Sequence, residues 1–167
     1  MPAGASARKM AESLREEARA LAAKADDWHA GAVGEERVER ALHAASSEAV
    51  RVLHDRLLDP GSSDANLDHL VVATSGVYLV DAKNWTGNVT LYNDSLYQHW
   101  NTAAGRQSAH KNQELYKVRG MAAKVGKAIG RDVTPVLCLA SDRADQFGPP
   151  QEMGLPRLRL TVLGRWI

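Results

Sequence analysis

The sequence predicts an α/β domain with a mixed sheet, preceded by an N-terminal helix. Three observations lead to this prediction: an amphipathic helical pattern near the N-terminus, strand-like segments between residues 50 and 100, and a later helix followed by another strand. The order helix, three strands, helix, strand is typical of an α/β sandwich. With 44% hydrophobic and 25% charged residues, the 167-residue chain can bury the core that such a domain needs.

Residues 5–28 have the pattern of an amphipathic helix. The apolar residues recur at spacings of four and three and form one stripe, whereas the other faces are charged. Such a helix could pack on the domain or pair with a partner helix, either of another protein or of a second copy. The stripe consists of Met10, Leu14, Ala18, Leu21, Ala25 and Trp28.

The remaining elements follow from turn signals and apolar runs. Glycines at 31 and 34 should interrupt the first helix, and a second helix is expected from Gly34 to about Ala45. We expect a loop at 59–63, hairpin turns at 74–76 and 93–94, and a long helix over 105–129. Pro135 suits a sheet edge or the start of a strand. The expected strands are 50–53, 67–73, 77–83, 89–92, 96–100, 133–140 and 158–163.

Charge is unevenly distributed along the chain, although the net charge is only +1. Residues 31–100 hold ten acidic and five basic residues, whereas residues 101–131 hold seven basic residues and one acidic residue. An acidic half beside a basic helix is what a metal site next to a phosphate-binding surface would look like. A solvated, charged helix face would give the same pattern, so both interpretations stay open.

Several classes of protein are excluded or disfavoured. The single cysteine, Cys138, excludes an internal disulfide framework and a cysteine-rich zinc site, and its apolar surroundings predict a buried, unreactive thiol. The N-terminus alternates charges and lacks the apolar core of a signal peptide. No apolar run approaches the ~20 residues that span a bilayer. We therefore expect a cytoplasmic protein without a membrane partner.

The chemistry-bearing residues lie on two neighbouring strands. Asp81 and Lys83 are two residues apart, so they share one face of a strand that is otherwise apolar. Asp68 is seven residues before Ser75 and Asp81 six residues after it, so a hairpin should bring the two carboxylates together. Two adjacent carboxylates repel each other unless a proton or a cation lies between them, and Mg²⁺ or Mn²⁺ prefers such oxygen ligands. A buried salt bridge of Lys83 with either aspartate is the alternative.

Three motifs in order resemble the nuclease-related domain family, NERD. They are Gly31-Ala32-Val33-Gly34-Glu35, Asn66-Leu67-Asp68-His69-Leu70, and residues 76–87 with Asp81-Ala82-Lys83-Asn84-Trp85 and Gly87. The resemblance covers roughly residues 29–140. It implies a restriction-endonuclease-like α-β-β-β-α-β core and membership of the PD-(D/E)XK superfamily, with Leu67 in place of the proline of that name.

The resemblance also implies roles for individual residues. Asp68, Asp81 and the carbonyl of Ala82 would hold Mg²⁺ or Mn²⁺, Lys83 would be the catalytic lysine, and Glu35 would assist from the first core helix. Gln107 would be a supporting glutamine, for which Gln113 competes. Together with the basic segment, this predicts contacts to nucleic acid from Arg106, Gln107, Lys111, Lys117 and Lys124.

The sequence thus predicts a Mg²⁺-dependent nuclease that hydrolyses phosphodiester bonds, with DNA as the expected substrate. Two alternatives stay open: a nucleic-acid-binding module with a non-catalytic nuclease fold, and an interaction protein that works through its N-terminal helix. The expected organisation is an N-terminal helix (1–28), a nuclease-like domain (29–145), and a C-terminal loop and strand (146–167) that could continue into a longer protein.

Overall fold

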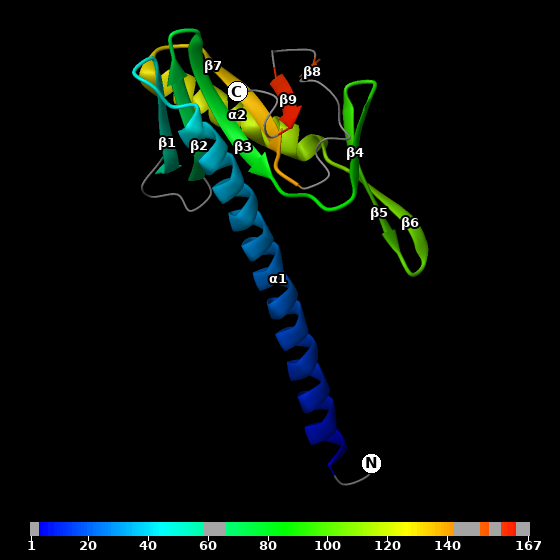
Figure 1. The fold of residues 1–167 in the computed structure, drawn as a ribbon. Helices are drawn as coiled ribbons and strands as arrows, with labels where there is room; N and C mark the ends of the chain where they lie inside the picture. The colour runs from blue at the N-terminus through cyan, green and yellow to red at the C-terminus, as the bar shows by residue number, and fades with distance from the viewer. Residues whose placement is uncertain (1–3, 59–65, 142–150, 154–157, 163–167) are drawn as a thin grey trace.

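The main sheet of the protein is mixed and lies between two helices. The computed structural model describes residues 4–58, 66–141, 151–153 and 158–162, the last two ranges by their backbone only. The sheet has the strand order β1-β2-β3-β7-β9-β8, and a smaller sheet, β4-β5-β6, stands beside it (Figure 1). The elements are α1 (Ala5–Ala44), β1 (Val50–Leu57), β2 (Asn66–Ala73), β3 (Gly76–Lys83), β4 (Asn88–Tyr92), β5 (Ser95–Thr102), β6 (Gly105–His110), α2 (Asn112–Ile129), β7 (Val133–Leu139), β8 (Gln151–Met153) and β9 (Leu158–Val162).

The predicted core α-β-β-β-α-β is confirmed as α1, β1 to β3, α2 and β7. Strand β3 is antiparallel to β2 and parallel to β7. One apolar cluster joins α2 to one face of the sheet through Val118, Leu79 and Leu137. A second cluster joins the end of α1 to the other face through Val38 and Val80. Because both faces of β3 are covered, its sequence is nearly continuously apolar, and a charge there needs a partner.

The first helix is one continuous helix of 40 residues, so the predicted interruption at Gly31 and Gly34 is wrong. Only Gly34, Val38 and Leu42 of this helix are buried, and its N-terminal part projects away from the sheets (Figure 1). Gly34 is required for close packing rather than for a turn: a Cβ there would lie 2.7 Å from the Cβ of Asn84. The glycine lets the helix touch the chain just beyond β3.

We expect Gly34→Ala to destabilise the domain, although alanine favours helix by about 1 kcal/mol over glycine. The added methyl group must displace Asn84, and such overpacking costs about 1–3 kcal/mol. Gly120→Ala, on an exposed turn of α2 with open space around it, is the matched control and should stabilise by up to about 1 kcal/mol. Urea unfolding of both variants measures the difference, and equal stabilisation by the two would contradict the packing role of Gly34.

The predicted long helix over 105–129 is also wrong at its beginning. Residues 105–110 form β6, which pairs antiparallel with β5 and places Gln107 opposite Trp100. Helix α2 begins only at Asn112, whose side-chain oxygen accepts a hydrogen bond of 2.8 Å from the backbone N–H of Leu96. The hairpin with β5 therefore decides the structure of residues 105–110.

The other predicted strands are confirmed within one to four residues. Strand β7 lies between β3 and β9, so Pro135 is not at an edge but is the third residue of an inner strand. The predicted loop at 59–63 and the last residue of the strand predicted over 158–163 lie outside the described residues. Neither α1 nor α2 is both long and apolar enough to cross a membrane.

Candidate active site

Asp81 and Lys83 lie at the end of β3, on the face that α2 covers. Lys83 Nζ is 2.7 Å from Asp81 Oδ2, and Asp81 is only 5% exposed. Apart from this ion pair, Asp81 Oδ2 has no hydrogen-bond partner among the described residues. The neighbouring strand pairs Leu137 with Asp81 and Leu139 with Lys83, which keeps water from that side. The predicted shared face is therefore observed, and the ion pair is inside the protein rather than on its surface.

Asp68 reaches this pair from β2. The register that pairs His69 with Val80 puts Asp68 one residue before the pair and Asp81 one residue after it. Asp68 Oδ2 accepts a hydrogen bond of 2.9 Å from the backbone N–H of Ala82, the residue between Asp81 and Lys83. The two carboxylates are thus held on adjacent strands, as the turn at 74–76 predicts.

Glu35 approaches the same site from α1, one turn before the buried Val38. Burial raises the pKa of Glu35, Lys83 lowers it, and Asp55 and Asp81 raise it further. These influences show that the carboxylate of Glu35 is within electrostatic reach of both Asp81 and Lys83. Glu35 lies between Gly34 and Val38, which are buried against the sheet, and is itself half-buried, so its carboxylate points towards the domain.

The site carries more negative than positive charge. Burial, followed by repulsion from Asp81, raises the pKa of Asp68 from 3.8 to about 7. Burial also raises the pKa of Asp81, against the opposing attraction of Lys83. For Lys83, burial lowers the pKa, but Asp81, Asp68 and Glu114 together outweigh it, so the ammonium stays charged. The Lys83 ammonium therefore faces the carboxyl groups of Asp81, Asp68 and Glu114, and a further cation would relieve the repulsion between the carboxylates.

Glu114 is a site residue that the sequence analysis missed. Its Oε2 lies 3.7 Å from Lys83 Nζ, and it stands in the first turn of α2. Lys117, one turn later, lowers the pKa of Asp81. Glu114 is the one acidic residue of the basic segment 101–131, and this isolated carboxylate could have drawn attention to it. Because the predicted helix began at residue 105 instead of 112, the sequence did not place Glu114 beside Lys83.

The residues predicted to contact nucleic acid do not form one helical row. Arg106 and Gln107 are exposed on β6, so the prediction that Gln107 opens the long helix is wrong. Lys117 and Lys124 are exposed on α2, seven residues apart. The ammonium of Lys111, at the junction of β6 and α2, lies 5.2 Å from the centre of the Trp85 ring. The basic groups thus come from β6, from α2 and from the junction between them, and of these Lys117 is the one that influences the pKa of Asp81.

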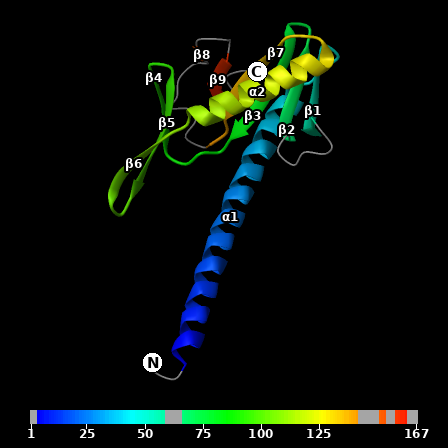
Figure 2. The same cartoon turned by 180° about the vertical axis from the view of Figure 1, so that it is seen from behind.

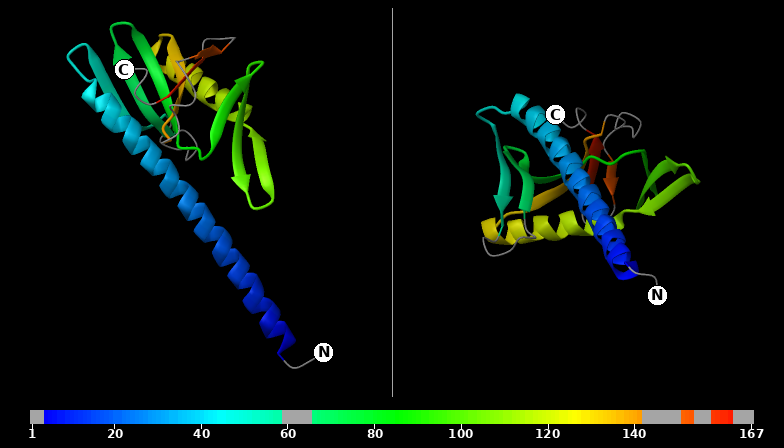
Figure 3. Two further views of the ribbon diagram at one scale, coloured as in Figure 1. Left: turned by 45° about the vertical axis from the view of Figure 1, so that its right-hand side comes forward. Right: turned by 90° about the horizontal axis from the view of Figure 1, so that it is seen from below.

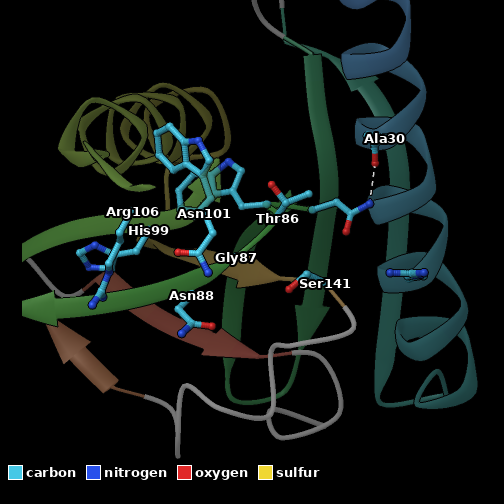
Figure 4. Close-up of a pocket in the computed structure, with 12 residues that line it drawn as sticks. Ala30, Thr86, Gly87, Asn88, His99, Asn101, Arg106 and Ser141 are labelled. Carbon is cyan, nitrogen blue, oxygen red and sulfur yellow. Dashed lines mark hydrogen bonds between the residues drawn. The ribbon is translucent and has the colours of Figure 1, made fainter. Parts of the chain in front are cut away.

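A polar pocket of about 790 Å³ adjoins the site between α1, the chain after β3, and the small sheet (Figure 4). Asn84, the residue after Lys83, donates a hydrogen bond of 2.8 Å to the carbonyl of Ala30 and so ties α1 to the pocket. Gly87 has φ +82°, and a Cβ there would lie 2.0 Å from the carbonyl oxygen of His99. Other lining residues include Thr86, Asn88, Asn101, Arg106 and Ser141.

Two histidines and the cysteine have structural positions. His69 is 2% exposed, and its Nδ1 is 2.8 Å from Nδ1 of His54 on β1. Burial and then the neighbouring His54 lower the pKa of His69 to about 4, so it is neutral at pH 7. Burial, with a contribution from Asp81, raises the pKa of the Cys138 thiol to about 12. The prediction that Cys138 is buried is confirmed, and a raised thiol pKa is what an unreactive cysteine would have.

Comparison with known families matches residues 30–140 to NERD, the nuclease-related domain. The same search finds no match among curated proteins or among solved structures. The matched range begins in α1, ends just after β7, and includes every residue of the site described above. Because it spans more than half of the chain, the chain belongs to the NERD family, within the PD-(D/E)XK-like nuclease superfamily.

Proposed function

We propose that the chain is a nuclease that uses Mg²⁺ or Mn²⁺ to hydrolyse phosphodiester bonds, with DNA as the expected substrate. The observation that supports this most directly is the convergence of Asp68, Asp81 and Lys83 at the end of β3. Charged groups are rarely buried in an inner strand without a purpose, and these three are the types that metal-assisted phosphodiester hydrolysis requires.

The residues present fit a divalent cation. The described residues contain no group of three His, Cys, Asp or Glu side chains placed closely enough to hold a metal ion. Mg²⁺, however, is usually held by only one or two carboxylates and keeps several waters. Asp68, Asp81 and the carbonyl of Ala82 would hold it, with Glu35 acting through a water. When bound, the cation makes a water more acidic and offsets charge on the phosphate.

The chain's own groups account for the rest of the chemistry. Lys83 carries its positive charge into the site and can stabilise negative charge that grows on a phosphate oxygen during the reaction. Asp81 at 2.7 Å and Glu114 at 3.7 Å hold the ammonium in place. Glu35 can accept a proton from a water at the site. Lys117, Lys124, Lys111 and Arg106 would bind the flanking phosphates.

Cleavage of linear, nicked and single-stranded DNA, and of RNA, with Mg²⁺ or Mn²⁺ tests the proposal. We expect metal-dependent cleavage that stops in EDTA and that falls by at least about 100-fold in Asp81→Ala. Lys9→Ala, on the exposed part of α1, is the control and should keep full activity. Calorimetry should show Mg²⁺ or Mn²⁺ binding that Asp81→Ala weakens. Neither cleavage nor metal binding by the parent chain would overturn the proposal.

The second candidate is a nucleic-acid-binding module that does not cleave. It is favoured by the short Lys83–Asp81 ion pair, which is stable without a metal, and by the lack of a three-ligand group in the described residues. Binding of nucleic acid that is unaffected by EDTA and by Asp81→Ala, without any cleavage, would identify this function.

A further inference from the structure

The N-terminal part of α1 exposes large apolar side chains that nothing in the described structure covers. Residues 12–30 are all exposed, and the helix projects from the domain as a single rod (Figure 2; Figure 3, left). Among its side chains, Leu14 is 56%, Leu21 68% and Trp28 74% exposed. Most helical stability in proteins comes from the packing of an amphipathic face, so this exposed apolar stripe indicates a partner.

The stripe has the spacing of a coiled-coil seam. From residue 7 to residue 32 the apolar positions alternate strictly in steps of four and three, which is the heptad spacing that keeps a seam facing a partner helix. Alanine and a large residue alternate over most of this length. The positions are Ala7, Ala11, Leu14, Ala18, Leu21, Ala25, Trp28 and Ala32.

We propose that residues 7–32 of α1 pair with the same residues of a second copy in an antiparallel two-stranded coiled coil. With the twofold axis between Arg19 and Ala20, Ala18 faces Leu21 of the second copy, Ala25 faces Leu14, and Ala11 faces Trp28. Each large side chain thus packs against an alanine. In a parallel pair each layer would contain identical residues, so Trp28 would face Trp28 and alanines would face alanines, with poor packing density.

The flanking positions favour the same arrangement. In the antiparallel pair Glu17 lies beside Lys24 of the second copy, and the symmetry repeats this pairing of opposite charges. The large exposed Met10 lies beside Gly31, where there is open space. In a parallel pair the corresponding neighbours of Glu17 and Lys24 would be Ala22 and His29, so no acid would meet a base. Charge and size complementarity therefore both select a second copy as the occupant.

The length of the seam also fits the domain. The 26 residues from 7 to 32 span about 40 Å at 1.5 Å per residue. Helix α1 first touches the domain at Ala30, whose carbonyl accepts the hydrogen bond from Asn84, and its first buried residue is Gly34, so the seam ends where the domain begins. An antiparallel pair therefore places the two domains at opposite ends of the rod, where they do not collide. A parallel pair would bring both domains to the same end. This inference is independent of the proposed nuclease activity.

Sedimentation equilibrium of the full chain tests the association. We expect a mass of twice the 18.2 kDa of one chain at micromolar concentration, and 18.2 kDa for Leu21→Glu. Ala23→Glu, on the outer face of the same helix, is the matched control and should stay dimeric. Circular dichroism of Leu21→Glu checks that the domain remains folded. A monomeric parent chain at all concentrations would overturn the proposal, as would a Leu21→Glu variant that remains a dimer.

Cysteine cross-linking tests the orientation. A mixture of Leu14→Cys and Ala25→Cys chains should form a disulfide between different chains under mild oxidation, whereas Leu14→Cys alone should not. Cys138 is buried and does not interfere. Cross-linking of Leu14→Cys with itself would show a parallel pair and overturn the antiparallel arrangement. Charge exchange gives a second test: Glu17→Lys should weaken the dimer at least tenfold, and adding Lys24→Glu to the same chain should restore it.

Discussion

Lys83→Met should abolish cleavage and at the same time destabilise the folded domain. The methionine keeps most of the side chain's length and apolar contacts but removes the ammonium that lies 2.7 Å from Asp81. Asp81, 5% exposed, would then be a buried carboxylate without its counterion. Removing one member of a buried ion pair costs about 3–5 kcal/mol. We expect a loss of this size in urea unfolding at pH 8 with EDTA, and at least about a 100-fold loss of cleavage.

The double variant Lys83→Met with Asp81→Asn separates the two effects. Because it removes both charges, it should recover most of the lost stability, whereas activity should stay absent. Single-turnover cleavage and urea unfolding of the same preparations measure both quantities. An active Lys83→Met protein would contradict the role of the ammonium in the reaction. Unchanged stability would contradict the burial of Asp81.

Asp68→Asn should stabilise the metal-free protein at pH 8 and leave its stability nearly unchanged below pH 4. The folded protein holds a proton on Asp68 up to a pKa of about 7, whereas the unfolded chain releases it near 3.8. The protonated Asp68 therefore stabilises the folded state fully below pH 3.8, and this stabilisation is lost as the pH rises through 7. A pKa difference of about three corresponds to about 4 kcal/mol, which is the upper limit of the gain.

The pH profile must be compared between the two proteins, because His69 changes stability in the opposite direction. Its pKa is lowered from 6.5 to about 4, so its contribution is present above 6.5 and is lost as the pH falls towards 4. His69 is common to both proteins, and the difference between their unfolding free energies isolates Asp68. Asparagine can still accept the hydrogen bond from Ala82. A difference that does not grow between pH 4 and 7 would contradict the raised pKa.

The central part of the site was predictable because it depends on short-range rules. Alternation along a strand places Asp81 and Lys83 on one face, and a short hairpin turn brings Asp68 opposite Asp81. Both relations involve residues fewer than twenty positions apart. The hydrogen bond between Asp68 and the N–H of Ala82 is the local consequence of that pairing.

The misplaced elements depend on contacts that a local pattern does not contain. Gly34 looks like a helix breaker, yet the helix continues through it, and the glycine makes room for Asn84, fifty positions later. Residues 105–110 pair with β5 rather than joining α2, and the position of Glu114 beside Lys83 depends on that choice. The sequence contains the relevant residues, but only the packed domain decides which of them meet.

Substitutions at the end of β3 and substitutions at the exposed basic positions should have very different effects on stability. The end of β3 at Asp81 to Lys83 pairs with β7 on one side and is hydrogen-bonded to the Asp68 side chain on the other, so a substitution there disturbs neighbouring strands. By contrast, Arg106 on β6 and Lys117 and Lys124 on α2 are exposed. Such positions tolerate exchange, because surface substitutions usually change stability by less than about 0.5 kcal/mol. Relatives built on this plan can therefore differ at such exposed positions while they share the same buried end of β3.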